Sequence, residues 1–107
     1  MKVFYRPYSQ SELLALIRAG LLALKERLPL KRVVLFGSYA KDRQTAGSDI
    51  DLLVIYSGPP LPDAFSIVKR TLKVPRLEPH VYSEEEYEQV RPTVERMIDD
   101  AIPLEVD

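Results

Sequence analysis

The first half of the chain alternates between two kinds of hydrophobic pattern. From residue 11 to residue 28, apolar side chains recur at helical spacing, with Glu12 in the first turn and Pro29 after the end, which predicts an amphipathic helix. Two short apolar runs then follow at 31–36 and 49–56. Each is rich in β-branched or aliphatic residues and bounded by turn-forming residues, so both predict buried strands.

The second half continues this alternation with weaker signals. Pro79 lies inside an otherwise strand-like run, which indicates an edge strand or a bulge. Ser83 and Glu86 have the spacing of a capping box that opens a helix containing Pro92. The remaining predicted elements are a helix over 63–73, a strand over 76–82, a helix over 83–101 and a strand over 102–106.

This order of elements predicts a single small domain over residues 1–107. Helix, strand, strand, helix, strand, helix and strand are typical of an α/β (α+β) fold, with a mixed sheet of three or four strands flanked by helices. A chain of 107 residues with 46% hydrophobic residues can bury one core. The sequence has neither an apolar run of about 18 residues nor the pattern of a signal peptide, so we expect a cytoplasmic protein without a membrane segment.

Composition narrows the chemistry that is available. The chain has no cysteine, which excludes disulfides, thiolate nucleophiles and cysteine-based zinc sites, and His80 is its single histidine. Charge is uneven: residues 1–76 hold 13 Lys and Arg against 6 Asp and Glu, whereas residues 77–107 hold 2 against 10. A basic first part suits a polyanionic ligand such as a nucleotide, and the acidic end suits a basic partner, although uneven solvated charge is an equally good interpretation.

One stretch combines a glycine turn with paired acids. Gly37 and Ser38 follow the first predicted strand, where a sharp turn with exposed N–H groups can hold a phosphate. After ten intervening residues, Asp49 and Asp51 begin the next strand on the same face, about 7 Å apart. Like charges at that spacing repel unless a cation lies between them, and Mg²⁺ accepts such ligands together with substrate phosphates. The alternative is that both aspartates only solvate the start of a strand.

The Gly-Ser turn and the Asp-x-Asp strand together resemble the signature of the DNA polymerase β-like nucleotidyltransferases. The chain looks like their minimal nucleotidyltransferases, which implies the polymerase β-like fold. The resemblance implies that Asp49, Asp51 and a third acid, Glu78, are catalytic metal ligands. It also implies that Gly37, Ser38 and Lys41 bind the nucleotide phosphates. Two departures stand out: Glu78 replaces the usual aspartate and precedes a proline, and Lys41-Asp42 replaces a basic residue followed by glycine.

The resemblance also implies a reaction and a partner. Two Mg²⁺ ions, or Mn²⁺ in their place, would support transfer of a nucleoside monophosphate, with AMP from ATP preferred, to an acceptor hydroxyl. The expected acceptor is a HEPN-domain protein, with this chain as the antitoxin of a toxin–antitoxin pair; a homo-oligomer is a further expectation. A non-catalytic antitoxin that acts by occlusion is the alternative. Direct binding of nucleic acid is not expected, because the chain lacks interleaved aromatic and basic residues.

Overall fold

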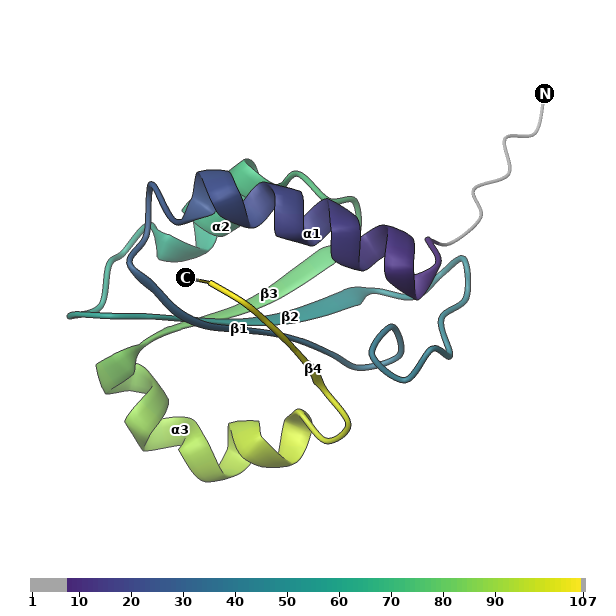
Figure 1. Cartoon of the computed structure of the whole chain (residues 1–107). Helices are drawn as coiled ribbons and strands as arrows, with labels where there is room; N and C mark the ends of the chain where they lie inside the picture. The colour runs from purple at the N-terminus through teal and green to yellow at the C-terminus, as the bar shows by residue number, and fades with distance from the viewer. Residues whose placement is uncertain (1–7, 107) are drawn as a thin grey trace.

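A computed structural model describes residues 8–106 as one four-stranded sheet with helices on both faces (Figure 1). The strand order is β3-β2-β1-β4. The elements, in chain order, are α1 (Gln10–Leu24), β1 (Leu30–Phe36), β2 (Ile50–Tyr56), α2 (Ala64–Leu72), β3 (Leu77–Ser83), α3 (Glu84–Met97) and β4 (Ile102–Leu104). This is the predicted order of elements and the predicted fold class, which are therefore confirmed.

The sheet is mixed, and its topology places two strand starts side by side. β1 pairs antiparallel with both β2 and β4, whereas β2 and β3 are parallel and are connected by α2. The N-terminal ends of β2 and β3 therefore lie together, next to the C-terminal end of β1, at the right of Figure 1. β3 is an edge strand, as Pro79 indicated.

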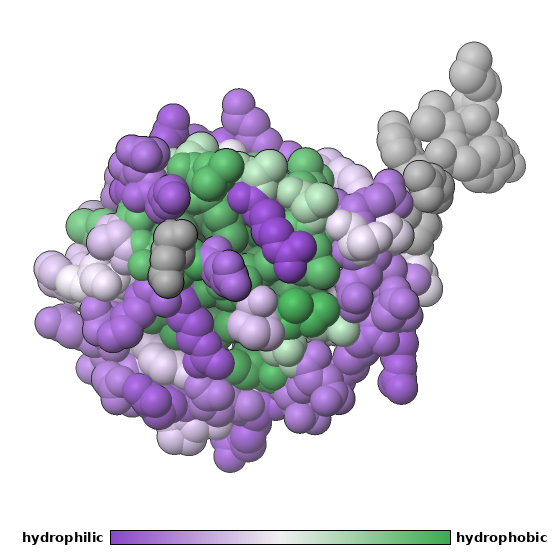
Figure 2. All heavy atoms as spheres, in the orientation of Figure 1, coloured by the Kyte–Doolittle hydropathy of each residue, from purple (hydrophilic) through white to green (hydrophobic). Residues whose placement is uncertain are grey.

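Each face of the sheet has its own hydrophobic cluster. α1 and α2 cover one face, and α3 covers the other (Figure 1). The first cluster contains Leu13 and Ile17 of α1, Val68 of α2 and alternate strand residues such as Leu52. The second is smaller and includes Leu53. Because successive strand residues point to opposite faces, the apolar runs bury residues on both sides of the sheet. In Figure 2 the apolar residues (green) lie centrally, surrounded by hydrophilic ones (purple).

Both long helices begin with complete capping boxes. Ser83 and Glu86 exchange side-chain-to-backbone hydrogen bonds at the start of α3, which confirms the predicted box. Ser9 and Glu12 do the same at the start of α1, a Ser-x-x-Glu signal that the helical spacing alone does not reveal.

The predicted helix ends were too late. α1 ends at Leu24 rather than residue 28, because the following backbone tightens into turns in which the Arg27 and Leu28 amides both donate to the Leu24 carbonyl. Leu28 still packs in the core, which explains why the apolar pattern extends past the helix. α3 ends at Met97 rather than residue 101, before the left-handed Asp100. None of the helices within residues 8–106 is long and apolar enough to span a bilayer.

Candidate active site at the start of strands β2 and β3

Strand register brings two of the predicted acids together. Asp51 of β2 lies opposite Glu78 of the parallel strand β3, and on its other side it lies opposite Phe36, the last residue of β1. Asp49 was predicted to begin the second strand, which is wrong: it comes just before β2, whose first residue is Ile50, because its side chain pairs outside the ladder with Arg76. The three acids therefore lie at one end of the sheet. Asp51 and Glu78 point to the α3 face by strand alternation.

Gly37 lies directly against the Asp51 carboxylate. A Cβ atom at position 37 would lie 2.4 Å from Asp51 Oδ2 and 3.2 Å from its Cγ. Such a contact is far inside van der Waals distance, so only glycine fits here without displacing the acid. Gly37 also has a φ of 78°, in the left-handed region that favours glycine. The glycine that ends β1 and the second aspartate of the motif thus form one packed unit.

The segment after Gly37 is a single tight turn rather than a helix. The Lys41 amide donates to the Gly37 carbonyl, and Asp42, with a φ of 55°, ends the turn. The buried Tyr39 side chain anchors the turn in the core. Gln10 Nε2 at the start of α1 donates to the carbonyls of Tyr39 and Ala40, at 2.9 and 3.1 Å.

This turn leaves a row of backbone donors unused. Among the contacts within residues 8–106, the amide N–H groups of Ser38, Tyr39 and Ala40 donate to no protein acceptor. Successive N–H groups of this kind suit an anion. The Lys41 side chain is exposed at the end of the turn.

Electrostatics single out Asp51 among the acids. Burial raises its pKa, and the nearby carboxylates of Asp49 and Glu78 raise it further, while His80 opposes this shift. The raised pKa of Asp51 is consistent with the position of the three carboxylates at one end of the sheet. A carboxylate in this setting gains from any cation that approaches it.

Within residues 8–106, His80 is the basic side chain nearest to Asp51. Its Nε2 lies 3.8 Å from Asp51 Oδ1, and its ring packs on Phe36 with the ring centroids 5.1 Å apart. The side chain is one-third exposed. The expectation from strand parity, that His80 shares a face with Glu78, agrees with this position.

Arg76 is a residue of this region to which the sequence analysis gave no role. Its guanidinium donates to the carbonyls of Gly47 and Ser48 and to Asp49 Oδ1, the last at 3.3 Å. No motif or periodic pattern in the sequence marks it, because its contacts join positions 27 to 29 residues apart. Asp49 is thus paired with Arg76, whereas Asp51 and Glu78 are neighbours by register.

The described side chains do not converge on a common metal position. No group of three or more His, Asp or Glu side chains in residues 8–106 is arranged so that it could hold a metal ion. The assignment of Asp49, Asp51 and Glu78 as metal ligands therefore stays a prediction. The same holds for phosphate binding by Gly37, Ser38 and Lys41.

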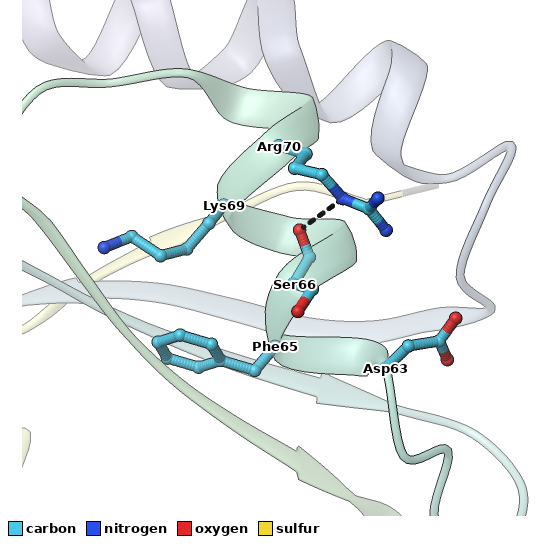
Figure 3. A pocket seen from close by; sticks show the side chains of 5 residues that line it. All are labelled: Asp63, Phe65, Ser66, Lys69 and Arg70. Atoms are coloured by element: carbon cyan, nitrogen blue, oxygen red, sulfur yellow. Dashed lines mark hydrogen bonds between the residues drawn. The ribbon is translucent and has the colours of Figure 1, made fainter.

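A separate hollow lies along α2 and contains none of the predicted site residues. Asp63, Phe65, Ser66, Lys69 and Arg70 line it (Figure 3), with a volume of about 320 Å³. The Lys69 ammonium lies 5.8 Å from the Phe65 ring centroid, and Arg70 Nε donates to the Ser66 carbonyl. These residues follow the C-terminal end of β2, at the opposite end of that strand from Asp51.

Known proteins resemble this chain in both sequence and fold. The chain is 43% and 41% identical over 49 residues to two proteins of Methanocaldococcus jannaschii, "Putative protein adenylyltransferase MJ0126" and "Putative protein adenylyltransferase MJ1217". The matched part is 46% of this chain and 50% of each relative. The chain thus spans about half the length of the curated relatives it matches.

A solved structure and a family model extend the likeness to most of the chain. The crystal structure of a protein from Sulfolobus solfataricus, described as a "putative nucleotidyltransferase", superposes with a TM-score of 0.63 at 24% identity, covering 89% of this chain and 81% of that one. At this identity the likeness shows the fold alone. The model of the nucleotidyltransferase domain matches residues 17–104, which include the glycine turn and all three acids. This chain therefore belongs to the nucleotidyltransferase domain family.

Proposed function

We propose that this chain transfers a nucleoside monophosphate, AMP from ATP, to an acceptor hydroxyl and releases pyrophosphate. The observation that carries the proposal is the contact between Gly37 and Asp51, where a Cβ atom would lie 2.4 Å from the carboxylate. This contact sets a turn with unused N–H groups beside an acid whose pKa is raised by burial and by Asp49 and Glu78. A magnesium nucleotide would satisfy both halves of this arrangement, since it supplies phosphate oxygens to the amides and a cation to the acids.

The three carboxylates fit divalent metal by their chemistry. Carboxylate oxygens are the ligands that Mg²⁺ prefers, and the burial of Asp51 beside two other acids favours occupation by a cation. In this proposal Asp49, Asp51 and Glu78 hold two Mg²⁺ ions, with Mn²⁺ as a substitute. Such ions would supply neutralisation of the triphosphate charge and would lower the pKa of the acceptor hydroxyl.

The turn after β1 would hold the phosphates. Gly37 allows close approach of the ligand because it has no side chain, and Ser38 contributes its hydroxyl as a further donor. Lys41, exposed at the end of the turn, would pair with a phosphate oxygen. Gln10 and the buried Tyr39 keep this turn in place before the nucleotide binds. Catalysis by these residues is positioning and charge stabilisation.

We further propose that the acceptor is a protein, a HEPN-domain partner for which this chain is the antitoxin. The relatives that are described as protein adenylyltransferases support a protein hydroxyl as the acceptor. The acidic end of the chain, with 10 Asp and Glu against 2 Lys and Arg after residue 76, suits a basic partner surface.

The test combines binding with transfer. Calorimetric titration with Mg·ATP measures nucleotide binding. Incubation with ATP labelled in the α-phosphate and a HEPN-domain protein from the same genome measures transfer. Asp51→Asn is expected to lower the transfer rate by about 100-fold or more, because loss of a direct ligand exceeds the effect of losing an outer-shell partner. Asp63→Asn is the matched control, since Asp63 is an exposed aspartate whose side chain makes no capping hydrogen bond at the start of α2.

The outcomes separate catalysis from occlusion. Labelling of the partner by the wild type and by Asp63→Asn, but not by Asp51→Asn, would support the proposal. Inhibition of the partner by an unlabelled complex, with equal potency for the wild type and Asp51→Asn, would instead support the non-catalytic antitoxin. Labelling by Asp51→Asn at the wild-type rate would refute the role of this acid.

A further inference from the structure

The two aspartates of the Asp-x-Asp motif are held in place by different means. Asp51 lies inside β2 and is paired by register with Phe36 on one side and Glu78 on the other. Asp49 precedes the strand, so the hydrogen bonds of the sheet do not fix it. Whatever holds Asp49 beside Asp51 must come from outside the ladder.

Arg76 supplies that support through four consecutive residues. Its Nε donates to the Ser48 carbonyl at 3.2 Å, and its Nη2 donates to the Gly47 carbonyl and to Asp49 Oδ1. Its own carbonyl accepts from the Ile50 amide at 2.9 Å. Arg76, directly before β3, therefore makes a hydrogen bond to each of the residues 47–50 that lead into β2.

The loop before Asp49 is compact and is anchored to the rest of the chain at both of its ends. Ser48 and Thr45 close it internally, because the Thr45 amide donates to Ser48 Oγ at 2.8 Å and the Ser48 amide donates to the Thr45 carbonyl at 3.1 Å. Gln44 Nε2 donates to the Tyr8 carbonyl at 3.2 Å at the start of the loop, so Arg76 is the anchor of the end that leads into Asp49. The guanidinium presents its donors from two nitrogens, Nε and Nη2, in a rigid planar fork, whereas the three donors of a lysine ammonium converge on one nitrogen, so lysine does not reproduce this spread of contacts.

We propose that Arg76 is a positioning residue for the metal nucleotide, which it serves by holding Asp49 beside Asp51. This inference rests on the proposed function. Arg76 and Asp49 are about half exposed, at 52% and 55%, so their ion pair is weak enough for a divalent cation to displace. The bonds to the two carbonyls remain when Asp49 turns to the metal. Arg76 therefore helps metal binding by anchoring the loop more than it hinders metal binding by competing for the Asp49 carboxylate.

The matched control is Lys73. Like Arg76 it is a cation with a left-handed backbone, at φ 52° against 64°, and it lies three residues away at the end of α2. Its exposed side chain makes no hydrogen bond or ion pair with the part of the chain that the structure describes. Lys73→Gln and Arg76→Gln therefore remove the same charge from the same end of the molecule, but only the second removes the anchor.

The experiment measures Mn²⁺ binding by electron paramagnetic resonance in the presence of a non-hydrolysable ATP analogue. It also measures hydrogen exchange of the 44–50 backbone in metal-free protein. Arg76→Gln is expected to weaken Mn²⁺ binding about tenfold, within the range for lost outer-shell partners, and to speed exchange of the loop. Lys73→Gln is expected to change neither. Arg76→Lys, which keeps the charge but not the fork, is expected to resemble Arg76→Gln.

Three results would overturn the proposal. Unchanged exchange in Arg76→Gln would show that the loop does not need this anchor. Faster exchange with unchanged or tighter Mn²⁺ binding would show that the anchor does not serve the metal. Arg76→Lys that binds Mn²⁺ as the wild type does would assign the effect to charge alone. Absence of nucleotide-dependent Mn²⁺ binding by folded wild-type protein would overturn the proposed function itself, and with it this role for Arg76.

Discussion

The two ends of β2 carry charge in opposite ways. At its C-terminal end, where β1 and α3 begin, charges are paired: Lys31 Nζ lies 2.6 Å from Glu84 Oε2, and Arg32 Nη1 lies 2.9 Å from Glu95 Oε1. The hydrogen bond from Lys31 lowers the pKa of Glu84. Hydrogen bonds from Tyr87 and then Arg32 lower the pKa of Glu95.

At its N-terminal end the strand gathers like charges instead. Burial, Asp49 and Glu78 raise the pKa of Asp51, and the nearby His80 only partly offsets them. Paired charges favour the folded chain, whereas a cluster of acids opposes folding in the absence of a cation. Perturbed carboxylates are concentrated at functional sites. The charge pairs that favour the folded chain and the acids of the proposed active site therefore lie at opposite ends of one strand.

The largest effect on stability and nucleotide binding is expected from Gly37→Ala, which places a methyl group against Asp51. The new methyl group would lie 2.4 Å from Asp51 Oδ2 and 3.2 Å from Cγ, so rotation of the carboxylate alone cannot relieve the contact. We expect a loss of more than about 1–2 kcal/mol in the free energy of unfolding, the usual cost of a left-handed non-glycine residue. The free energy of Mg·ATP binding should decrease by more than the free energy of unfolding does. Urea unfolding and calorimetry measure the two effects.

Gly58→Ala separates strain from contact. Gly58 has a φ of 93°, so alanine is strained there as well, but a Cβ would meet no atom within 4 Å. This variant should lose about 1–2 kcal/mol of stability and keep its nucleotide affinity. Equal loss of affinity in both variants would contradict the special role of the Gly37 contact.

Asp51→Asn is expected to raise the free energy of unfolding of metal-free protein, by less than Gly37→Ala lowers it. Because the folded pKa of Asp51 lies above its ordinary value of 3.8, the wild type loses stability as the pH rises from that value through the folded pKa. The asparagine variant lacks this loss, so it should be the more stable protein near neutral pH. The difference should vanish below pH 3.8. Urea unfolding with a chelator across the pH range measures this difference in stability. A wild type that is more stable than Asp51→Asn at neutral pH would contradict the inference that the acid cluster opposes folding.

The smallest effect is expected from Arg32→Met at the paired end. The Arg32 and Glu95 side chains are 40% and 43% exposed, so loss of their ion pair should cost no more than about 1 kcal/mol. Since the pKa of Glu95 is lowered, this contribution is present above its ordinary value of 4.5 and is lost as the pH falls through the folded value. Label transfer should be unchanged. Thermal unfolding at neutral and acidic pH measures the loss of stability. A transfer rate that falls together with stability would contradict the separation of stabilising charge pairs and proposed active site between the two ends of β2.

Local patterns predicted the elements well and their ends less well. The capping residues Ser83 and Glu86 fix the start of α3 through short-range hydrogen bonds, which sequence spacing reveals. The end of α1 depends on how residues up to Leu28 pack after the helix has stopped, and the apolar pattern is the same whether that residue is helical or not. Strand neighbours are also fixed by packing rather than by local sequence.

The candidate site was predictable where it depends on strand alternation and less so where it depends on loops. Strand period predicted one face for Asp49 and Asp51, but only Asp51 lies within β2. The family resemblance supplied Glu78, which the register places opposite Asp51. The link between Arg76 and the segment before β2 joins positions far apart in the chain through side-chain bonds to backbone carbonyls. Such bonds leave no periodic trace in the sequence.

Pro79 affects whether another strand can pair with the outer edge of β3. Proline has no amide hydrogen, so the outer edge of β3 presents an interrupted row of donors to any incoming strand. Sheet extension across this border, whether by another copy or by a peptide, is thereby discouraged. On this side of the sheet, beside Glu78 and His80, contacts with other macromolecules are therefore expected to use helices and loops rather than an added strand.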